Sequence, residues 1–270
     1  MITVKAVWQY PFKSGKGISL PFAQFDNEGM IGDRRLVALD EKGIFVTARR
    51  YAELLHLSCT PNEQGWLLQH PNASTNYQLT RSLIVAQNTQ INGTLWRDEL
   101  NGIDAGDEAS AWLSEVIKVK VRVVLWQEKT RTSGKYNLET NFSDAAPLLI
   151  ATQESLIAAS SLANISPDMR RFRPNIVLTG AEAFAEERWQ ELNIGNQRFT
   201  LLDTCVRCIL TTRDPDTGIA HDDKQPLRAL KAHHTNEQRQ PIFGINAKFM
   251  QPIASGEQGK IFVGDEVTVR

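Results

Sequence analysis

Two cysteines lie three residues apart in the stretch TCVRCILTTRDPDTG, residues 204–218, and the whole chain has three cysteines. Arg207 lies between Cys205 and Cys208, and a rigid acidic turn, DPD, follows. Such a pair can form a disulfide, supply half of a zinc site, act as a redox pair or offer one thiolate to a metal. Each possibility implies a different protein.

The other residues argue against a zinc site and against a redox pair. A structural zinc takes about four ligands, and the remaining candidates are Cys59 and the adjacent histidines His233 and His234. Adjacent histidines rarely bind one ion with good geometry. A thioredoxin-like pair should open a helix after a strand, whereas the ILTT that follows Cys208 has β-branched residues typical of a strand or turn.

A single metal-binding thiolate is the possibility that needs least from the rest of the chain. An odd number of cysteines argues against a disulfide framework, and a reducing compartment would keep Cys205 and Cys208 as thiols. Cys59 is best explained as a small buried hydrophobe. If the metal is carried by an organic cofactor, one cysteine suffices, and Arg207 supplies a positive charge that favours the thiolate.

A phosphorylated cofactor would need basic and hydroxyl side chains on loops elsewhere. Four segments offer them: PFKSGKG at 11–17, GDRR at 32–35, TARR at 47–50 and RRFRPN at 170–175. Lys13 and Ser14 lie in a turn whose spacing is not that of a Walker A loop, which excludes an ordinary P-loop nucleotide site. For Arg34, Arg49 and Arg173 taken singly, a surface salt bridge is the simpler explanation.

The elements that must position these groups are mostly strands in the first part of the chain. Short alternating apolar runs separated by turn residues predict a meander or barrel of β-strands. The runs cover residues 2–10, 34–40, 43–50, 54–60, 65–70 and 89–96. A small helix is predicted at 107–117 behind an acidic first turn, and strand character returns at 118–126.

The second part of the chain begins with a polar segment, residues 129–147, that could be a mobile loop over a site. A helix is predicted from Thr152, with a weak cap and an apolar face of Leu156, Ile157 and Leu162. Strands follow from PNIVLTG onward. A hairpin near 195–196 delivers Cys205 at a strand end, and KIFVGDEVTVR is predicted to be a closing hairpin.

Length and composition exclude several classes of protein. A chain of 270 residues can bury the core of one large domain or two modest ones. Its net charge of −1 gives no bulk attraction to nucleic acid or to an anionic membrane. Neither a signal-like N-terminus nor a run of about 18 uncharged apolar residues is present. We therefore expect a cytoplasmic protein with no nucleic-acid or membrane partner.

The chain resembles the MOSC-domain proteins that carry an N-terminal β-barrel domain, a group that includes the mitochondrial amidoxime-reducing component and its bacterial relatives. The resemblance is carried, in order, by YPFKSGKG, GDRRLVALDEKGIFVTAR, FRPNIVLTG, CVRCILTTRDPDTG, PLRALK and VGDEVTV. It implies a mainly β fold with a few helices: an N-terminal MOSC β-barrel domain at residues 1–118 and a MOSC domain, also a β-barrel, at 119–270.

The resemblance also implies a molybdenum cofactor, in which a pterin dithiolene holds molybdenum and one protein cysteine completes the sulfur coordination. By its position in the motif, Cys208 is the implied metal ligand and catalytic residue, with Arg207 and the backbone around Val206 against the pterin. The remaining implied cofactor-binding residues match family positions on loops: Lys13, Ser14, Arg34, Arg49, Arg173 and Asn175.

The implied activity is reduction of N-hydroxylated compounds, such as hydroxylamines, amidoximes and N-hydroxy bases, to amines or amidines. The chain shows no four-cysteine motif for an iron–sulfur cluster, so we expect a separate iron–sulfur, flavin or haem protein as electron donor. Arg213 stands where relatives more often have an apolar residue, which changes the charge expected near the substrate. The alternative is a sulfur-carrier or cofactor-handling protein that uses a cysteine persulfide.

Overall fold

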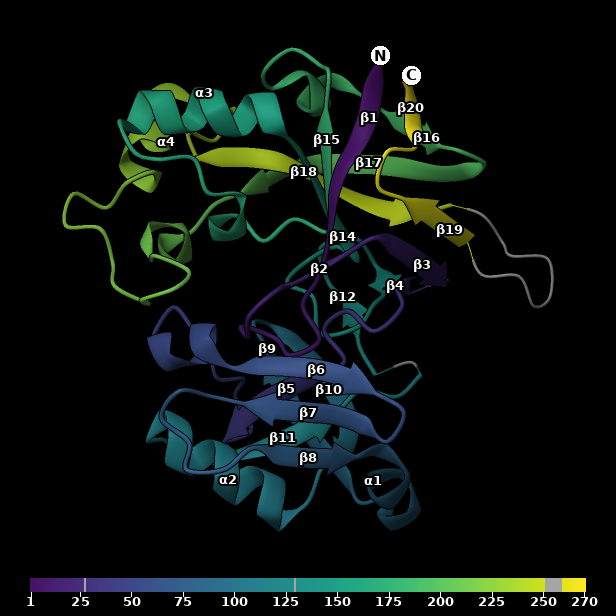
Figure 1. Cartoon of the computed structure of the whole chain (residues 1–270), viewed down its shortest axis with the longest axis vertical. Helices are drawn as coiled ribbons and strands as arrows, with labels where there is room; N and C mark the ends of the chain where they lie inside the picture. Colours follow the sequence, from purple (N-terminus) through teal and green to yellow (C-terminus); the bar gives the residue numbers. More distant parts are fainter. Residues whose placement is uncertain (27, 129, 251–258) are drawn as a thin grey trace. The chain divides into compact units, whose positions relative to one another are not determined.

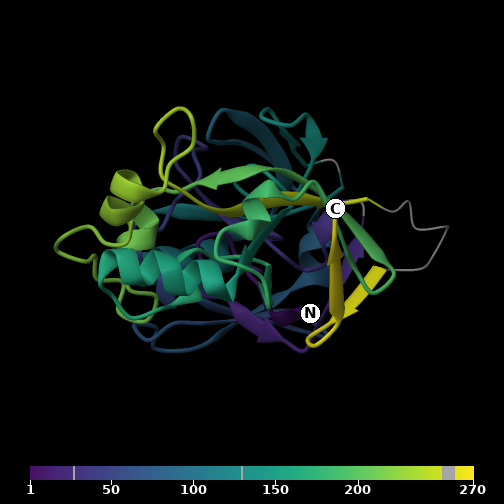
Figure 2. The same cartoon turned by 90° about the horizontal axis from the view of Figure 1, so that it is seen from above.

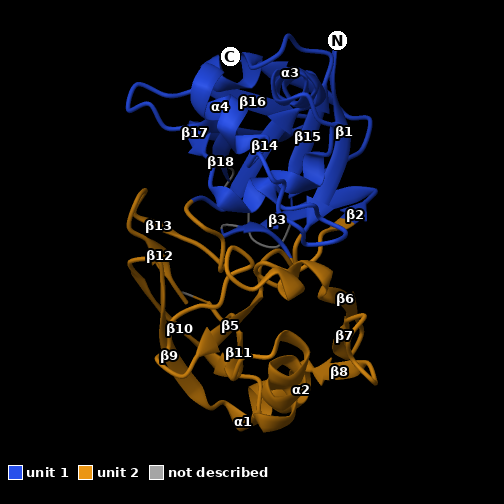
Figure 3. Cartoon of the chain, turned by 90° about the vertical axis from the view of Figure 1, so that its left-hand side faces the viewer, with its two compact units in different colours: residues 1–9, 19–31, 146–270 blue, residues 10–18, 32–145 orange. Residues whose placement is uncertain are grey.

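A computed structural model describes residues 1–26, 28–128, 130–250 and 259–270. The chain folds into two compact units (Figure 3), of which unit 1 comprises residues 1–9, 19–31 and 146–270 and unit 2 comprises residues 10–18 and 32–145. Both units are discontinuous in sequence, because the N-terminal strand belongs with the C-terminal half of the chain. The predicted domain boundary between residues 118 and 119 is not tested by this division and stays a prediction.

Unit 1 is built on a closed seven-stranded β-barrel (Figure 1). In ring order its strands are β15 (Ile176–Thr179), β14 (Leu148–Thr152), β18 (Ile242–Phe249), β17 (Gln197–Val206), β16 (Glu191–Ile194), β20 (Glu266–Val269) and β1 (Ile2–Gln9), and β1 closes the ring on β15. The β14–β15 pair is parallel and the other pairs are antiparallel. The mainly β fold with a barrel is therefore confirmed.

The barrel is filled by aliphatic and aromatic side chains that alternate along its strands. Val7, Ile150 and Phe199 are fully buried within one continuous core. A small sheet of β19 (Gly259–Phe262), β3 (Phe22–Asp26) and β4 (Gly29–Met30) adds Phe25, whose ring lies 5.2 Å from that of Phe199. The barrel is thus a packed scaffold and not a channel.

Two helices of unit 1, α3 (Gln153–Ala163) and α4 (Leu227–His233), lie side by side against the barrel (Figure 2). Three short 3₁₀ helices accompany them: η2 (Met169–Arg171), η3 (Ala185–Arg188) and η4 (Ile209–Thr212). A second core, with Leu156, Phe172 and Phe243 as members, joins these elements to the strands. Among the helices of the described residues, none is long and apolar enough to cross a membrane.

Among its described residues, unit 2 contains three sheets and two α-helices. Its largest sheet has the order β5 (Leu36–Asp40), β11 (Val121–Leu125), β10 (Asp98–Asp104) and β9 (Gln90–Leu95). The others are β6 (Ser58–Asn62), β7 (Gly65–Gln69) and β8 (Tyr77–Thr80), and the pair β12 (Thr132–Ser133) and β13 (Leu138–Glu139). Helix α2 (Asp107–Ile117) has the bounds that its sequence predicts, whereas α1 (Arg81–Gln87) was not predicted because no capping or acidic signal marks it.

Three other sequence predictions need correction. Residues 43–50 form isolated bridges at Ile44 and Phe45, followed by a turn, and not a strand. Residues 54–56 belong to the 3₁₀ helix η1 (Ala52–His56), so the predicted strand there begins only at Ser58. The C-terminal strands β19 and β20 are not a hairpin, since β19 pairs with β3 and β20 pairs with β1 and β16.

The predicted apolar face of α3 is also wrong in part. Thr152 caps the helix by accepting from the Ser155 N–H, as predicted, and Leu156 is buried. However, Ile157 and Leu162 are 52% and 45% exposed. The buried positions 155, 156, 159, 160 and 163 follow the helical period and are filled mostly by small residues, so a search for large apolar side chains misses this face.

The polar segment at 129–147 is only partly buried: residues 130–131 and 140–143 are packed in unit 2, whereas most of residues 134–139 are exposed; its first residue, 129, lies outside the described residues. Its later part contacts Lys13 through the Phe142 carbonyl and Asp144, so a role as a loop over a site stays a prediction. Arg131 is 2% exposed and donates to Asp98 and, at 2.6 Å, to the Ser143 carbonyl. Asn141 is fully buried and its amide donates to the Asp33 carbonyl at 2.8 Å. Hydrogen bonds order the buried polar residues of this segment and Phe142 adds a fully buried ring to an apolar core, so polar composition alone does not show which residues are buried.

Candidate functional site

Cys205 lies in β17, which ends at Val206, and Arg207 follows directly after the strand. The Arg207 guanidinium donates to the Cys205 sulfur through Nη1 at 3.0 Å and to the Phe172 carbonyl through Nη2 at 2.7 Å. Its Nε is buried and has no hydrogen-bond partner among the described residues. Arg207 therefore keeps one buried donor that an anionic or sulfur-bearing ligand would satisfy.

Cys208 follows at the start of η4. Its backbone is extended, with φ −124° and ψ 177°, and its carbonyl accepts from the Thr211 hydroxyl at 2.9 Å. The Arg207 N–H bonds to the Pro241 carbonyl, so backbone pairing continues one residue past the end of β17 at Val206. Both cysteines are free thiols and both are partly exposed.

The histidines proposed as zinc ligands are placed elsewhere. His234 contacts Glu187 through Nε2 at 2.8 Å and stacks on the Phe184 ring, with centroids 3.9 Å apart. Within residues 1–26, 28–128, 130–250 and 259–270, no three His, Cys, Asp or Glu side chains could hold a metal ion together. Cys59 is fully buried, and burial raises the pKa of its thiol well above the usual value. A closed zinc site built from these residues is not formed.

The turn from Phe172 to Asn175 lies against this cysteine segment. Phe172 is 2% exposed, and its ring stacks on that of Phe243 with centroids 3.8 Å apart. Arg173 follows with φ 57°, in the left-handed region. Asn175 is 1% exposed, and its side-chain amide bonds to the backbone of Trp8 and Leu149. Asn175 therefore anchors the turn that presents Arg173.

Two further arginines complete this part of unit 1: Arg171, which was not singled out from the sequence, and Arg213, which was noted as a departure from the family pattern. Arg171 donates to the Arg213 carbonyl at 2.7 Å and to the Asp214 carboxylate at 3.1 Å. Its Nε is buried without a hydrogen-bond partner among the described residues. The Arg213 guanidinium donates to the Gly218 carbonyl at 2.8 Å. The RRFRPN motif marked the segment, but only the fold shows which of its arginines faces the cysteine loop.

Lys13 is the centre of a second group of predicted residues, in unit 2. Its side chain is 6% exposed, and its ammonium donates to the Phe142 carbonyl at 2.8 Å and to Asp144 at 2.6 Å. Burial lowers the pKa of Lys13 to about 8, although Asp144 opposes this shift. The protein surroundings alone would raise the pKa of the Asp144 carboxyl, but Lys13 and the Trp96 indole hold it well below its usual range.

Arg34 and Arg49 lie near Lys13 in the same unit. Arg34 pairs with Asp33 and stands over the Tyr10 ring, 4.7 Å from its centroid. Arg49 stands over the Trp96 ring at 3.9 Å, and Trp96 donates to Asp144 at 3.0 Å. Burial disfavours the charged form of Arg34, but Asp33 outweighs it and raises the guanidinium pKa. These arginines pack on aromatic rings and are not isolated surface salt bridges.

Three of the predicted residues share an uncommon backbone conformation. Ser14, Arg34 and Arg173 have φ values of 68°, 44° and 57°, in the left-handed region that L-residues seldom adopt. Each such residue costs about 1–3 kcal/mol, and strained residues of this kind cluster at functional sites. Other residues of the chain, such as the helix C-caps Asn88 and Lys118, share this conformation, so it describes the shape of these loops and does not by itself assign them a role.

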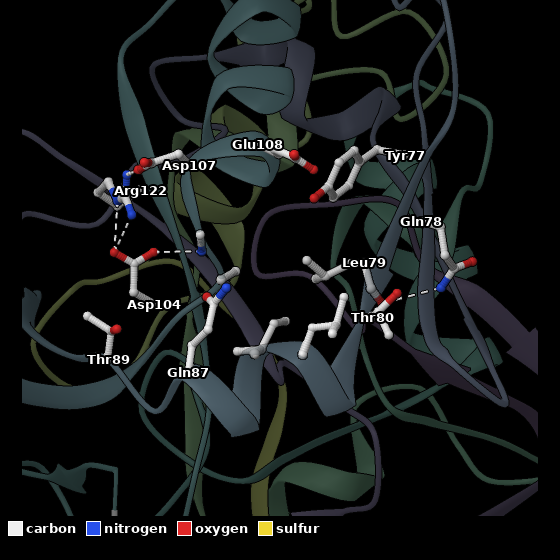
Figure 4. Close-up of a pocket in the computed structure, with 14 residues that line it drawn as sticks. Tyr77, Gln78, Leu79, Thr80, Gln87, Thr89, Asp104, Asp107, Glu108 and Arg122 are labelled. Atoms are coloured by element: carbon white, nitrogen blue, oxygen red, sulfur yellow. Dashed lines mark hydrogen bonds and ion pairs between the residues drawn. The ribbon is translucent and has the colours of Figure 1, made fainter.

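The predicted residues divide between the two units. Unit 2 holds Lys13, Ser14, Arg34 and Arg49, and unit 1 holds Arg173, Asn175, Val206, Arg207 and Cys208. Unit 2 also contains a cavity of about 640 Å³ that none of these residues lines (Figure 4). On one wall of the cavity Arg122 bonds to Asp104 and Asp107, so these charges largely satisfy one another.

The chain matches two family models: the MOSC N-terminal beta barrel domain over residues 1–120 and the MOSC domain over residues 137–268. It is similar to the mitochondrial amidoxime reducing component 2 of Macaca fascicularis, at 34% identity over 90% of this chain and 78% of that protein. It is also similar to the mitochondrial amidoxime-reducing component 1 of Mus musculus, at 33% identity over 98% of this chain and 81% of that protein.

Proposed function

Because the chain belongs to the MOSC family and has both its N-terminal barrel domain and its MOSC domain, we propose that it is a molybdenum-cofactor-dependent reductase of N-hydroxylated compounds. The substrates would be hydroxylamines, amidoximes and N-hydroxy bases, reduced to amines or amidines. The observation that carries the proposal is the partly exposed Cys208 thiol next to Arg207, whose Nε has no hydrogen-bond partner in the part of the chain that the structure describes.

The residues present fit such a cofactor. A soft thiolate suits a metal that already has sulfur ligands, and the buried Arg207 Nε–H would gain a partner. In unit 2, Lys13 and Arg49 offer cationic groups suited to a phosphate. The Asp144 side chain that pairs with Lys13 is 63% exposed, so it can turn towards solvent when another anion takes its place.

Each residue then has a distinct role. When bound, the cofactor would supply two-electron chemistry at molybdenum, with acceptance of an oxygen atom from the substrate. Cys208 would ligate the metal, and Arg207 and the Val206 backbone would orient the pterin. Asp214 is not suited to donate a proton at neutral pH: although its surroundings partly desolvate it, backbone N–H groups of its own turn lower its pKa.

The reaction also needs electrons from another protein, and we propose an iron–sulfur, flavin or haem donor. A cytoplasmic location remains part of the proposal. The first test is the molybdenum and pterin content of protein produced with molybdate, followed by benzamidoxime reduction with a chemical electron donor. Near-stoichiometric metal with turnover supports the proposal. Absence of both, with labile sulfur on the thiols, would instead support the persulfide carrier.

The pKa of Lys13 predicts how cofactor loading depends on pH. Lys13 is charged below a pH of about 8 and neutral above it, so an anionic group should bind more weakly as pH rises through that value. Well above the pKa, affinity should fall by up to about tenfold per pH unit. The measurement is the pterin retained by cofactor-free protein after incubation with released cofactor, between about pH 6.5 and about pH 9.5.

Lys13→Arg provides the matched control for this dependence. An arginine remains protonated throughout this range, so the variant should load to a similar extent at every pH. If wild-type protein also loads equally at every pH, Lys13 does not bind the cofactor's phosphate.

A further inference from the structure

The turn from Met169 to Arg173 holds the Cys208 segment on both sides of the cysteine. Upstream, the Phe172 carbonyl accepts from Arg207, the residue before Cys208, at 2.7 Å. Downstream, Arg171 donates to the Arg213 carbonyl, also at 2.7 Å. One short segment therefore contacts the chain immediately before Cys208 and five residues after it.

Arg171 makes its downstream contact with two groups at once. Besides the Arg213 carbonyl, it binds the Asp214 carboxylate, and its own side chain is only 13% exposed. The other oxygen of Asp214 accepts from the backbone N–H groups of Asp216 and Thr217, each at 3.0 Å. Arg171 is thus bonded to a turn that is itself well ordered.

This turn is connected to Cys208 by a single helical turn. Within η4, the Thr211 N–H bonds to the Cys208 carbonyl and the Arg213 N–H bonds to the Leu210 carbonyl, both at 3.1 Å. A 3₁₀ turn of this length is too short to be stable alone. Its position is therefore fixed by its surroundings: Thr211 and Thr212 are buried, the Thr212 carbonyl accepts from the His221 N–H at 2.9 Å, and the Arg171 contact holds the end opposite Cys208.

The neighbouring Arg170 provides a contrast. It pairs with Asp168 and Asp216, but the side chains of Arg170 and Asp216 are 36% and 55% exposed. Exposed pairs of this kind contribute less than about 1 kcal/mol. Among the hydrogen bonds of the described residues, none connects the Arg170 side chain to the backbone between Cys208 and Asp214.

We propose that Arg171 is a positioning residue that holds Cys208 in place by fixing the Arg213 carbonyl and the Asp214 carboxylate. The proposal rests on the proposed function only in taking Cys208 as the metal ligand. Arg171 itself touches neither the metal nor the substrate in this role. Its effect should be visible in cofactor-free protein as well as in the loaded enzyme.

The test is hydrogen–deuterium exchange, read by peptide mass spectrometry, on the cofactor-free full chain. In Arg171→Gln, the amides of Thr211 and Arg213 should exchange about tenfold faster, which corresponds to the loss of about 1.4 kcal/mol of charged hydrogen bonding. The exchange rate in Arg171→Lys should lie between the rates of the wild type and of Arg171→Gln, because one ammonium cannot reproduce both contacts. Arg170→Gln is the matched control and should change exchange by less than about twofold.

A second readout follows the thiol itself. The alkylation rate of Cys208 by iodoacetamide should change in Arg171→Gln but not in Arg170→Gln. In loaded protein, kcat should fall more than KM rises, because the metal ligand and not substrate binding is displaced. Rescue of kcat by Arg171→Lys, even in part, supports positioning.

Three results decide the matter. Unchanged exchange over residues 208–214 in Arg171→Gln overturns the proposal. Faster exchange throughout the barrel strands also overturns it, since Arg171 would then support the whole unit. Faster exchange confined to 208–214 in a protein that never binds molybdenum supports the positioning role while the proposed function fails.

Discussion

Cys208→Ala is expected to abolish molybdenum retention, whereas Cys205→Ala is expected to retain the metal. The Cys205 sulfur already accepts from Arg207 at 3.0 Å. Cys208 lies beyond the strand end, where its partly exposed thiol has no hydrogen-bond partner among the described residues. We therefore expect Cys208, and not Cys205, to give its sulfur to an incoming metal.

Molybdenum per chain, with oxidised-pterin fluorescence, measures this difference directly. Loss of the thiolate should reduce benzamidoxime reduction more than about a hundredfold, beyond the 10–100-fold typical of losing an outer-shell partner of a metal ligand. Cys205→Ala should lose less of this activity, because the substitution removes only the acceptor for one Arg207 N–H. Both cysteines are partly exposed, so neither change should cost more than about 1 kcal/mol of stability.

The control pair is Cys208→Ser and Cys205→Ser. Serine keeps the size of the side chain but replaces the soft sulfur, so Cys208→Ser should fail to retain metal while Cys205→Ser should behave as wild type. If Cys205 proves to be the essential residue, the assignment of the ligand is reversed. If both variants keep full metal content, the metal is not held by either thiolate.

The residue types of the motifs pointed to a cysteine pair with Arg207 and to basic loops that include Lys13, whereas the choice of Cys208 as ligand came from the family resemblance. These assignments stay predictions. The carboxylates that pair with these cations were not selected. Asp144 lies 131 residues from Lys13 along the chain, and no local pattern reveals a contact between residues so far apart.

Periodicity predicted regular elements well and irregular ones badly. Helix α2 follows an acidic first turn and a clear apolar stripe, and it was predicted with its correct bounds. Strand pairing at the C-terminus was wrong because β19 and β20 join different sheets, a choice that depends on tertiary packing. Burial within the polar segment at 129–147 was missed for the same reason, since the partners of its buried residues Arg131 and Asn141 come from elsewhere in unit 2.

Phe172→Ala is expected to destabilise unit 1 by about 3–5 kcal/mol, the usual cost of removing a buried aromatic ring. The ring is 2% exposed and stacks on Phe243 at 3.8 Å, within the core that joins η2 to α3, α4 and the barrel. Urea unfolding of cofactor-free protein measures the loss. Phe262→Ala is the matched control: this ring is 47% exposed, so its removal should cost less than about 1 kcal/mol.

The same substitution should also weaken cofactor retention under conditions where the protein is still folded. The Phe172 carbonyl holds the Arg207 guanidinium at 2.7 Å, and the packed ring fixes the position of that carbonyl. Phe172→Leu keeps much of the apolar volume and should cost only about 1–2 kcal/mol, with molybdenum content close to wild type. If Phe172→Ala loses stability but retains full molybdenum and pterin, the core supports the barrel alone, and Arg207 does not depend on it for its place beside Cys208.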